Sequence, residues 1–133
     1  SVVYTHFDEV VAVVEDLGPG CFLFKFDVEA AFKQLPVDPR DFHLLGMTHR
    51  GMYFFDMTLP FGLRSSCLLW EKFACFLQWL FSRVCTCMLR HYLDDFVGAH
   101  SSKEEAERSL NSIADVARLL HLPLAADKTV GPT

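Results

Sequence analysis

The segment Val84 to Ala99, VCTCMLRHYLDDFVGA, decides the fold of this chain. Residues 84–93 have the apolar character of a strand, and residues 96–99 have the character of a second strand. Two adjacent carboxylates, Asp94 and Asp95, stand between them, so the segment predicts a β-hairpin with both acids at its tip. Concentrated negative charge favours a divalent cation. Because Asp also favours tight turns through local hydrogen bonds, a plain turn stays open as the alternative.

Composition limits the class of protein. The chain has 133 residues, is 51% hydrophobic and contains 13 Phe, so it is long and apolar enough for one domain with a substantial core. It shows no internal repeat, low-complexity tract or linker. The net charge of −5 is unfavourable for binding the negatively charged phosphate backbone of a nucleic acid. A nucleic-acid partner would therefore need metal ions or basic segments outside this chain.

Cysteine usage indicates a reducing compartment. The number of cysteines is odd, no C-x-x-C pair occurs, and His91 is not spaced from them like a zinc ligand set. We expect reduced, mostly buried thiols and an intracellular location, in the cytoplasm or nucleus. The most apolar stretch, residues 67–81, is too short and too charged to span a bilayer, so we expect no membrane partner. The cysteines are Cys21, Cys67, Cys75, Cys85 and Cys87.

Helical and extended patterns alternate in the rest of the chain. Extended runs are expected over residues 21–26, on both sides of residues 49–51, and over residues 124–126. This alternation predicts an α+β fold, an antiparallel sheet with helices on one face, of the split βαβ or ferredoxin-like type. Helices are expected to begin near Thr5, Ala30, Asp38, Ser65-Ser66 and Ser102, with Thr5, Asp38, the serine pair and Ser102 as caps.

The helix that begins at Ser65-Ser66 is unusually apolar. Its apolar side chains cover most of its circumference, which predicts that the helix is packed into the core. These side chains are Leu68, Trp70, Phe73, Phe76, Leu77 and Leu80.

Asp27 is a second informative acid, because it stands where a buried strand ends. If that strand lies beside the hairpin, the Asp27 carboxylate meets Asp94 and the two form a site for two divalent cations. Two cations roughly 3.5–4 Å apart can activate an attacking oxygen and stabilise a leaving one in phosphoryl transfer. Asp27 as a cap of the short helix near Ala30 is the alternative.

Four blocks of sequence, in order, resemble the palm motifs of reverse transcriptases. They are residues 26–32 (FDVEAAF), 59–66 (LPFGLRSS), 92–95 (YLDD) and 123–128 (PLAADK), and together they span nearly the whole chain. Residues 43–46 (HLLG) and 127–132 (DKTVGP) look most like retrotransposons of the DIRS group. The resemblance implies a palm fold and an RNA-directed DNA polymerase, a nucleotidyltransferase that extends a primer 3′-hydroxyl with deoxynucleoside triphosphates.

The resemblance also assigns a metal site. It makes Asp27 and Asp94 the carboxylates that bridge catalytic Mg²⁺ ions, with Mn²⁺ as a possible substitute. The carbonyl of Val28 is implied as a further ligand, and Asp95 as a supporting acid and ligand.

Nucleotide-binding residues follow from the same motifs. The ring of Phe32 falls where the family places a steric gate against the ribose 2′-hydroxyl, although Phe32 can also be read as a core residue. Phe61 and Gly62 are implied beneath the incoming nucleotide and template base. Lys128 resembles a lysine near the triphosphate that neutralises or protonates the departing pyrophosphate, with an exposed surface lysine as its alternative.

Arg64 and Tyr92 are implied as nucleic-acid contacts, and Arg64 at a helix start can equally be only solvated. The chain departs from the family at two positions. Phe61 stands where retroviral members have Gln, which removes hydrogen bonds to the nucleotide, and Cys67 replaces Pro, which changes the shape of that loop.

The organisation that follows is a single palm domain over residues 1–133, a fragment that lacks most of the fingers and the thumb. Its partners would be an RNA or DNA template-primer, deoxynucleoside triphosphates, and flanking fingers, thumb and RNase H regions of a longer polyprotein. Two other classes stay open. One is a catalytically silent, domesticated palm that acts as an interaction module, and the other is an unrelated domain that binds RNA through exposed aromatic side chains on its sheet.

Overall fold

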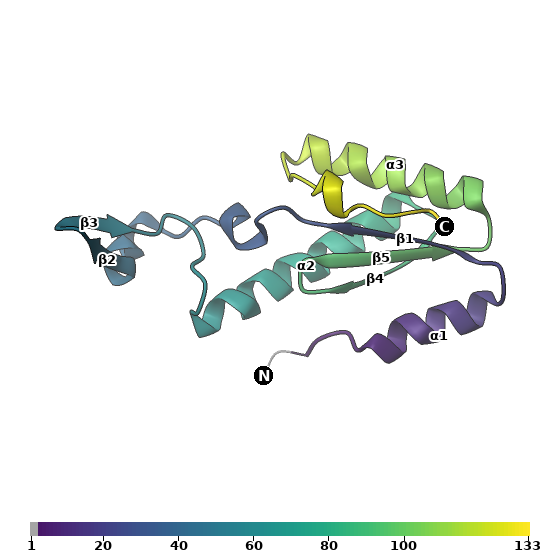
Figure 1. The fold of residues 1–133 in the computed structure, drawn as a ribbon, viewed down its shortest axis with the longest axis horizontal. Coiled ribbons are helices and arrows are strands. Elements are labelled where there is room, and N and C mark those ends of the chain that lie inside the picture. The colour runs from purple at the N-terminus through teal and green to yellow at the C-terminus, as the bar shows by residue number, and fades with distance from the viewer. Residues whose placement is uncertain (1–2) are drawn as a thin grey trace.

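The computed structural model describes residues 3–133 and centres on a three-stranded antiparallel sheet (Figure 1). The strand order is β1 (Phe22–Asp27), β5 (Asp95–His100), β4 (Met88–Tyr92). Because β5 is antiparallel to both neighbours, β1 and β4 run parallel, and the chain between them includes helix α2 (Arg64–Val84). This is the split βαβ arrangement that the sequence predicts.

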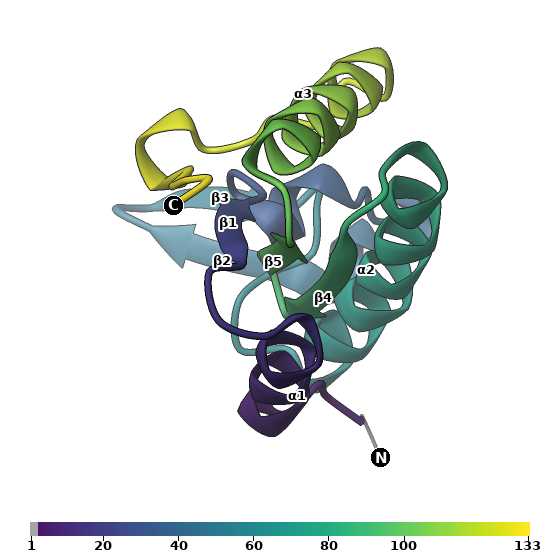
Figure 2. The same cartoon turned by 90° about the vertical axis from the view of Figure 1, so that its right-hand side faces the viewer.

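Helices cover both faces of this sheet (Figure 2). α2 contacts β4, and α3 (Lys103–Leu119) contacts β1 and β5 from the same side. α1 (Phe7–Leu17) lies against β4 and β5 on the opposite side. The predicted α+β class is confirmed. The prediction that all helices lie on one face of the sheet holds for α2 and α3, whereas α1 covers the other face.

Phenylalanine rings fill the core between the sheet and its two covering helices. Phe26 and Phe96, paired across β1 and β5, are fully buried, and their rings stack with centroids 5.0 Å apart. Phe81 of α2 meets both rings edge-on. Aromatic pairs of this kind contribute roughly 0.5–1.5 kcal/mol beyond their buried area. The alternation of Phe along β1 is therefore what attaches the sheet to α2.

α2 is less buried than its composition predicts. Trp70, Leu77 and Phe81 are fully buried, but Phe76 is 46% exposed and Trp79 is 54% exposed. The expectation of a helix packed into the core on most sides is therefore wrong. One face of α2 packs on the sheet, and the apolar side chains of the outer face lie open within residues 3–133.

The helix caps differ in part from those expected. α2 begins at Arg64 with Leu63 as its cap, and Ser66 lies inside the first turn, where its hydroxyl donates to the Pro60 carbonyl at 2.8 Å. α1 begins at Phe7, not at a Thr5 cap, and the Glu9 carboxylate accepts the backbone N–H of His6 at 3.4 Å. The predicted cap of α3 is confirmed, since the Ser102 hydroxyl accepts the Glu105 N–H.

A second hairpin projects away from the sheet (Figure 1). It joins β2 (Gly46–His49) and β3 (Met52–Phe55), and all residues of both strands are exposed. It follows two short 3₁₀ helices, η1 (Ala31–Gln34) and η2 (Pro39–Leu45). Asp38 caps η2 by accepting the Arg40 N–H, so this cap and the hairpin near residues 49–51 are both confirmed.

Three further expectations need correction. β4 begins at Met88 and not at residue 84, because α2 continues to Val84. Residues 124–126 form no strand within the described range: Leu124 makes a single bridge to Val28, and η3 (Ala126–Lys128) follows. The thiols are not mostly buried, because Cys87 alone is buried and Cys75 is exposed.

None of the helices that the structure describes is long and apolar enough to cross a membrane.

Candidate active site

The three aspartates lie at one end of the sheet. Asp27 is the last residue of β1, Asp95 is the first residue of β5, and the two are direct partners in the antiparallel register. Asp94 lies in the turn between β4 and β5, where Leu93 has a positive φ of 54°. The N–H of Val28 donates to the Asp94 carbonyl at 3.1 Å, which joins the end of β1 to that turn. Acids 67 positions apart in sequence are thus neighbours in space.

Asp27 is a buried carboxylate with an incomplete set of partners. It is 2% exposed, and its Oδ2 accepts a hydrogen bond from Lys128 Nζ at 2.7 Å. Among residues 3–133, Oδ1 has no hydrogen-bond partner. A buried carboxylate oxygen without a partner is costly, so this atom indicates a place where a cation can bind. The hydrogen bond with Asp27, together with its charge, raises the pKa of Lys128 and keeps the ammonium protonated.

The environment of Asp94 disfavours its charged carboxylate form. Burial raises the pKa of its carboxyl above the ordinary value, and the negative charges of Asp27 and Asp95 add to the increase. A backbone hydrogen bond offsets part of it. A bound cation would favour the charged carboxylate and so reverse this effect.

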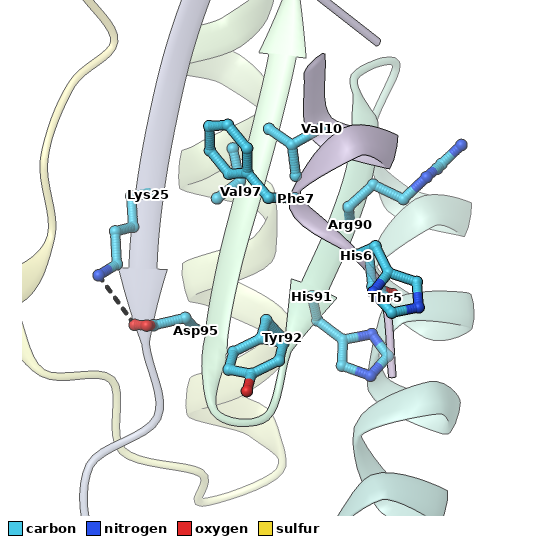
Figure 3. Close-up of a pocket in the computed structure, with 10 residues that line it drawn as sticks. All are labelled: Thr5, His6, Phe7, Val10, Lys25, Arg90, His91, Tyr92, Asp95 and Val97. Atoms are coloured by element: carbon cyan, nitrogen blue, oxygen red, sulfur yellow. Dashed lines mark ion pairs between the residues drawn. The ribbon is translucent and has the colours of Figure 1, made fainter. Parts of the chain in front are cut away.

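Asp95 has a different environment from Asp94. Its Oδ1 lies 2.9 Å from Lys25 Nζ, and both side chains are nearly half exposed (Figure 3). Sequence reasoning did not identify Lys25. The available signal was that Lys25 is the only lysine in the otherwise apolar strand FLFKFD and stands two residues before Asp27. Because side chains alternate along a strand, Lys25 and Asp27 lie on the same face.

The donor set fits a hard divalent cation, because every candidate ligand is an oxygen. In the chain by itself the three aspartates do not converge into one tight cluster, since the described residues bring three ligand atoms within 4.8 Å of one another only elsewhere, at Glu71, Cys75 and His91. Lys128 and Lys25 instead supply the positive charge at Asp27 and Asp95.

The two aromatic rings predicted to bind the nucleotide lie beside each other. Phe32, in η1, and Phe61, in the loop before α2, have ring centroids 5.3 Å apart. Phe61 is 82% exposed, whereas Phe32 packs partly against the core, and the gate role of Phe32 stays a prediction. Gly62 has a φ of +83°, a conformation that a side chain would disfavour, which accounts for glycine in this loop.

The two predicted nucleic-acid contacts lie at different places. Tyr92 ends β4, is 55% exposed, and has its ring 5.9 Å from that of Tyr4. Arg64 is exposed at the first turn of α2 and makes no ion pair with the aspartates of the described chain. A cavity of about 390 Å³ between α1 and the sheet opens beside Tyr92 and Asp95, with Phe7 and Val97 among its lining (Figure 3).

Comparison with known proteins supports this fold. The foamy virus protease-reverse transcriptase from prototype foamy virus, as a selenomethionine-labelled mutant, superposes with a TM-score of 0.77 at 17% identity over 97% of this chain and 16% of that one. The native form gives 0.71 at 18% identity over 81% and 14%, and the foamy viral enzyme in complex with dsDNA gives 0.76 at 14% identity over 100% and 27%. The chain therefore spans about a quarter or less of the length of these solved proteins.

No curated protein sequence matches this chain. The sequence profile described as "Reverse transcriptase (RNA-dependent DNA polymerase)" matches residues 3–132, nearly the entire sequence. This match agrees with the four ordered motifs. It also agrees with the split βαβ sheet, which has paired acids at one end. The chain belongs to the reverse transcriptase family.

Proposed function

We propose that residues 1–133 act as the palm of an RNA-directed DNA polymerase and extend the 3′-hydroxyl of a primer with deoxynucleoside triphosphates. One observation carries the proposal: the buried Asp27 carboxylate, with one unpartnered oxygen, stands at the end of β1 beside the turn that holds Asp94. A buried acid with raised-pKa neighbours at the end of a sheet is typical of a functional site.

Asp27 and Asp94, with the Val28 carbonyl, would hold Mg²⁺ or Mn²⁺. When bound, such cations lower the pKa of the attacking hydroxyl and neutralise charge on the phosphates. Asp95, whose charge is already balanced by Lys25, supports the site and its ligand set. This division of roles follows from burial: Asp27 is almost inaccessible to water, whereas Asp95 is half exposed.

Lys128 would change partners during the reaction. In the chain by itself its ammonium neutralises Asp27, and its raised pKa keeps it protonated. With cations held by the carboxylate, the Lys128 ammonium would be available to neutralise or protonate the departing pyrophosphate.

Phe32 and Phe61 would shape the nucleotide pocket. The contact between their rings fixes one wall, and an aromatic wall crowds a ribose 2′-hydroxyl without offering it a hydrogen bond. Gly62 allows the loop to approach the base, while Arg64 and Tyr92 would contact the template-primer. The resulting preference is for deoxynucleotides.

The proposal extends to origin and context. Residues 43–46 and 127–132 support descent from a retrotransposon, most like the DIRS group. The net charge of −5 supports a palm that relies on flanking fingers, thumb and RNase H regions to hold the nucleic acid. No observation favours the alternative of a catalytically silent interaction module.

Primer extension on a polyribonucleotide template, with Mg²⁺ or Mn²⁺ and with flanking regions restored, tests this function. Asp94→Asn should lower extension by a factor on the order of 10³ or more, because it removes a charge that the cations need. Asp16→Asn, at an exposed position of α1, is the matched control and should extend normally. Unchanged extension in Asp94→Asn would overturn the proposal.

A further inference from the structure

A second group of metal-binding side chains lies behind the hairpin that carries Tyr92 to Asp95. Glu71 and Cys75 belong to α2, and His91 belongs to β4, immediately before Tyr92. Glu71 and Cys75 are four residues apart, so they point from the same face of the helix, and this face lies against β4. The linear spacing of the cysteines and His91 predicts no zinc site, since the cluster forms only when α2 packs on the strand.

The distances within this cluster fit a tetrahedral ion. His91 Nε2 lies 3.0 Å from Glu71 Oε1, and Cys75 Sγ lies 3.6 Å from the same oxygen. All three ligand atoms are within 4.8 Å of one another. Tetrahedral zinc with bonds of about 2.0–2.3 Å needs ligand atoms roughly 3.3–3.8 Å apart, so small side-chain movements suffice.

The hydrogen bonds of His91 leave a lone pair directed at Glu71. His91 Nδ1 lies 2.6 Å from Gln78 Oε1, an acceptor, so Nδ1 carries the hydrogen. In the neutral imidazole Nε2 is then an acceptor, and it faces the Glu71 carboxylate, which is also an acceptor. With the Gln78 amide in this orientation, two acceptors face each other 3.0 Å apart, and a metal ion between them would satisfy both.

Burial makes the metal ion the better fit. The side chains of His91 and Glu71 are 4% and 9% exposed, and Glu71 Oε2 has no hydrogen-bond partner in the part of the chain that the structure describes. A hydrogen bond between His91 and Glu71 Oε1 alone leaves Oε2 buried without a partner, which is costly. A cation can use both oxygens. Figure 3 shows the His91 ring turned toward α2, away from the Tyr92 side of the hairpin.

We propose that Glu71, Cys75 and His91 form a binding site for Zn²⁺ or a similar borderline transition-metal ion, separate from the aspartates. The mixed oxygen, sulfur and nitrogen donors select zinc over magnesium. Cys75 is exposed and provides the route from solvent, and Gln78 positions His91 through its hydrogen bond to Nδ1. With both Glu71 oxygens, the Cys75 sulfur and the His91 Nε2 as its four donor atoms, the ion clamps β4 to α2 directly behind the hairpin.

Cobalt(II) titration of the metal-free full chain tests the site, because Co²⁺ bound to a thiolate gives a near-ultraviolet charge-transfer band that oxygen ligands do not give. We expect the band to saturate at about one equivalent, to be displaced by Zn²⁺, and to disappear in Cys75→Ser. Cys75 is exposed, so this variant keeps its fold, which circular dichroism checks. Cys21→Ser, at a half-exposed thiol outside the cluster, is the matched control and should keep the band.

Two further variants sharpen the result. His91→Gln should abolish the band, and Gln78→Ala should weaken Co²⁺ affinity by about 10-fold while the band is retained at saturation, as a positioning residue requires. A native chain without a thiolate band, or a band that survives in Cys75→Ser or in folded His91→Gln, overturns the proposal. In that case the cluster is a buried, hydrogen-bonded Glu71–His91 pair only.

Discussion

Asp94 and Asp95 are adjacent in the sequence but have different physical roles. Asp95 is paired with Lys25, whereas burial and two neighbouring carboxylates raise the pKa of Asp94. For a carboxyl whose pKa is higher in the folded state than in the unfolded state, the folded chain binds more protons between the two values. The free energy of unfolding then falls as the pH rises through that interval, which begins at the ordinary value of 3.8.

Asp94→Asn should therefore stabilise the chain when no divalent cation is present. At neutral pH we expect Tm to rise by about 1–4 °C, and we expect the difference to vanish below the ordinary pKa, where Asp94 is protonated in both states. Thermal melts in chelator across the pH range measure this. Asp95→Asn is the control from the next residue, and it should not raise Tm because it breaks the pair with Lys25. Equal behaviour of the two variants would contradict the assignment.

Lys128→Met should separate the two roles given to this lysine. Because the ammonium competes with cations for Asp27, its removal should tighten Mn²⁺ binding about two- to five-fold. The same change should slow primer extension, because the pyrophosphate loses its cation. Mn²⁺ titration and extension assays on one preparation, with Lys103→Met as control, measure both effects. A loss of Mn²⁺ affinity would show that Lys128 holds the site together rather than competing for it.

At residue scale the sequence predicted the acids and Lys128, but not that Lys128 pairs with Asp27 or that Lys25 pairs with Asp95. Motif order located Asp27, Asp94 and Lys128, and the structure places all three in contact or close to one another. The sequence did not predict the roles of Lys25 and Glu71. The contact of Lys25 depends on strand register, and that of Glu71 depends on which face of α2 packs against β4. Neither the strand register nor the packed face of α2 can be read from the linear sequence pattern.

At the scale of elements, β5 is the central strand and its fit to β1 sets the geometry of the site. Gly98 pairs with Phe24, and a Cβ at Gly98 would overlap the Phe24 ring. This glycine therefore leaves room for the tip of the Phe24 ring against the strand that carries Asp95.

Gly98→Ala should lower the free energy of unfolding by about 1–3 kcal/mol, because the Phe24 ring must move within a close-packed core. Urea unfolding measures the change. Gly46→Ala, in the exposed β2 and with no atom closer than 3.8 Å to the added carbon, is the matched control and should be nearly neutral. Equal stabilities of the two variants would show that the core accommodates the methyl group.

The elements themselves were largely predictable. Alternating Phe predicted β1, and turn chemistry predicted both hairpins, because these signals are local. The burial of α2 was overestimated, since apolar composition alone cannot say which side of a helix has a partner. The strand predicted over residues 124–126 does not form for a related reason: only Leu124 makes a bridge there, to Val28 just after β1.

At the scale of the whole molecule, an acidic chain brings three aspartates to one end of the sheet and pairs two of them, Asp27 and Asp95, with its own lysines. The net charge of −5, the unpartnered Asp27 oxygen and the raised pKa of Asp94 together describe a site that is completed by cations. The central claim is that Asp27 and Asp94 bind those cations jointly.

Mn²⁺ binding measured by electron paramagnetic resonance tests that claim most directly, because it needs neither template nor flanking regions. The measurement is made in a Cys75→Ser background, so that the second proposed site does not contribute. We predict that Asp27→Asn and Asp94→Asn each weaken Mn²⁺ binding about 10-fold or more, whereas Asp16→Asn leaves it unchanged. Equal Mn²⁺ affinity in all four proteins would contradict the account.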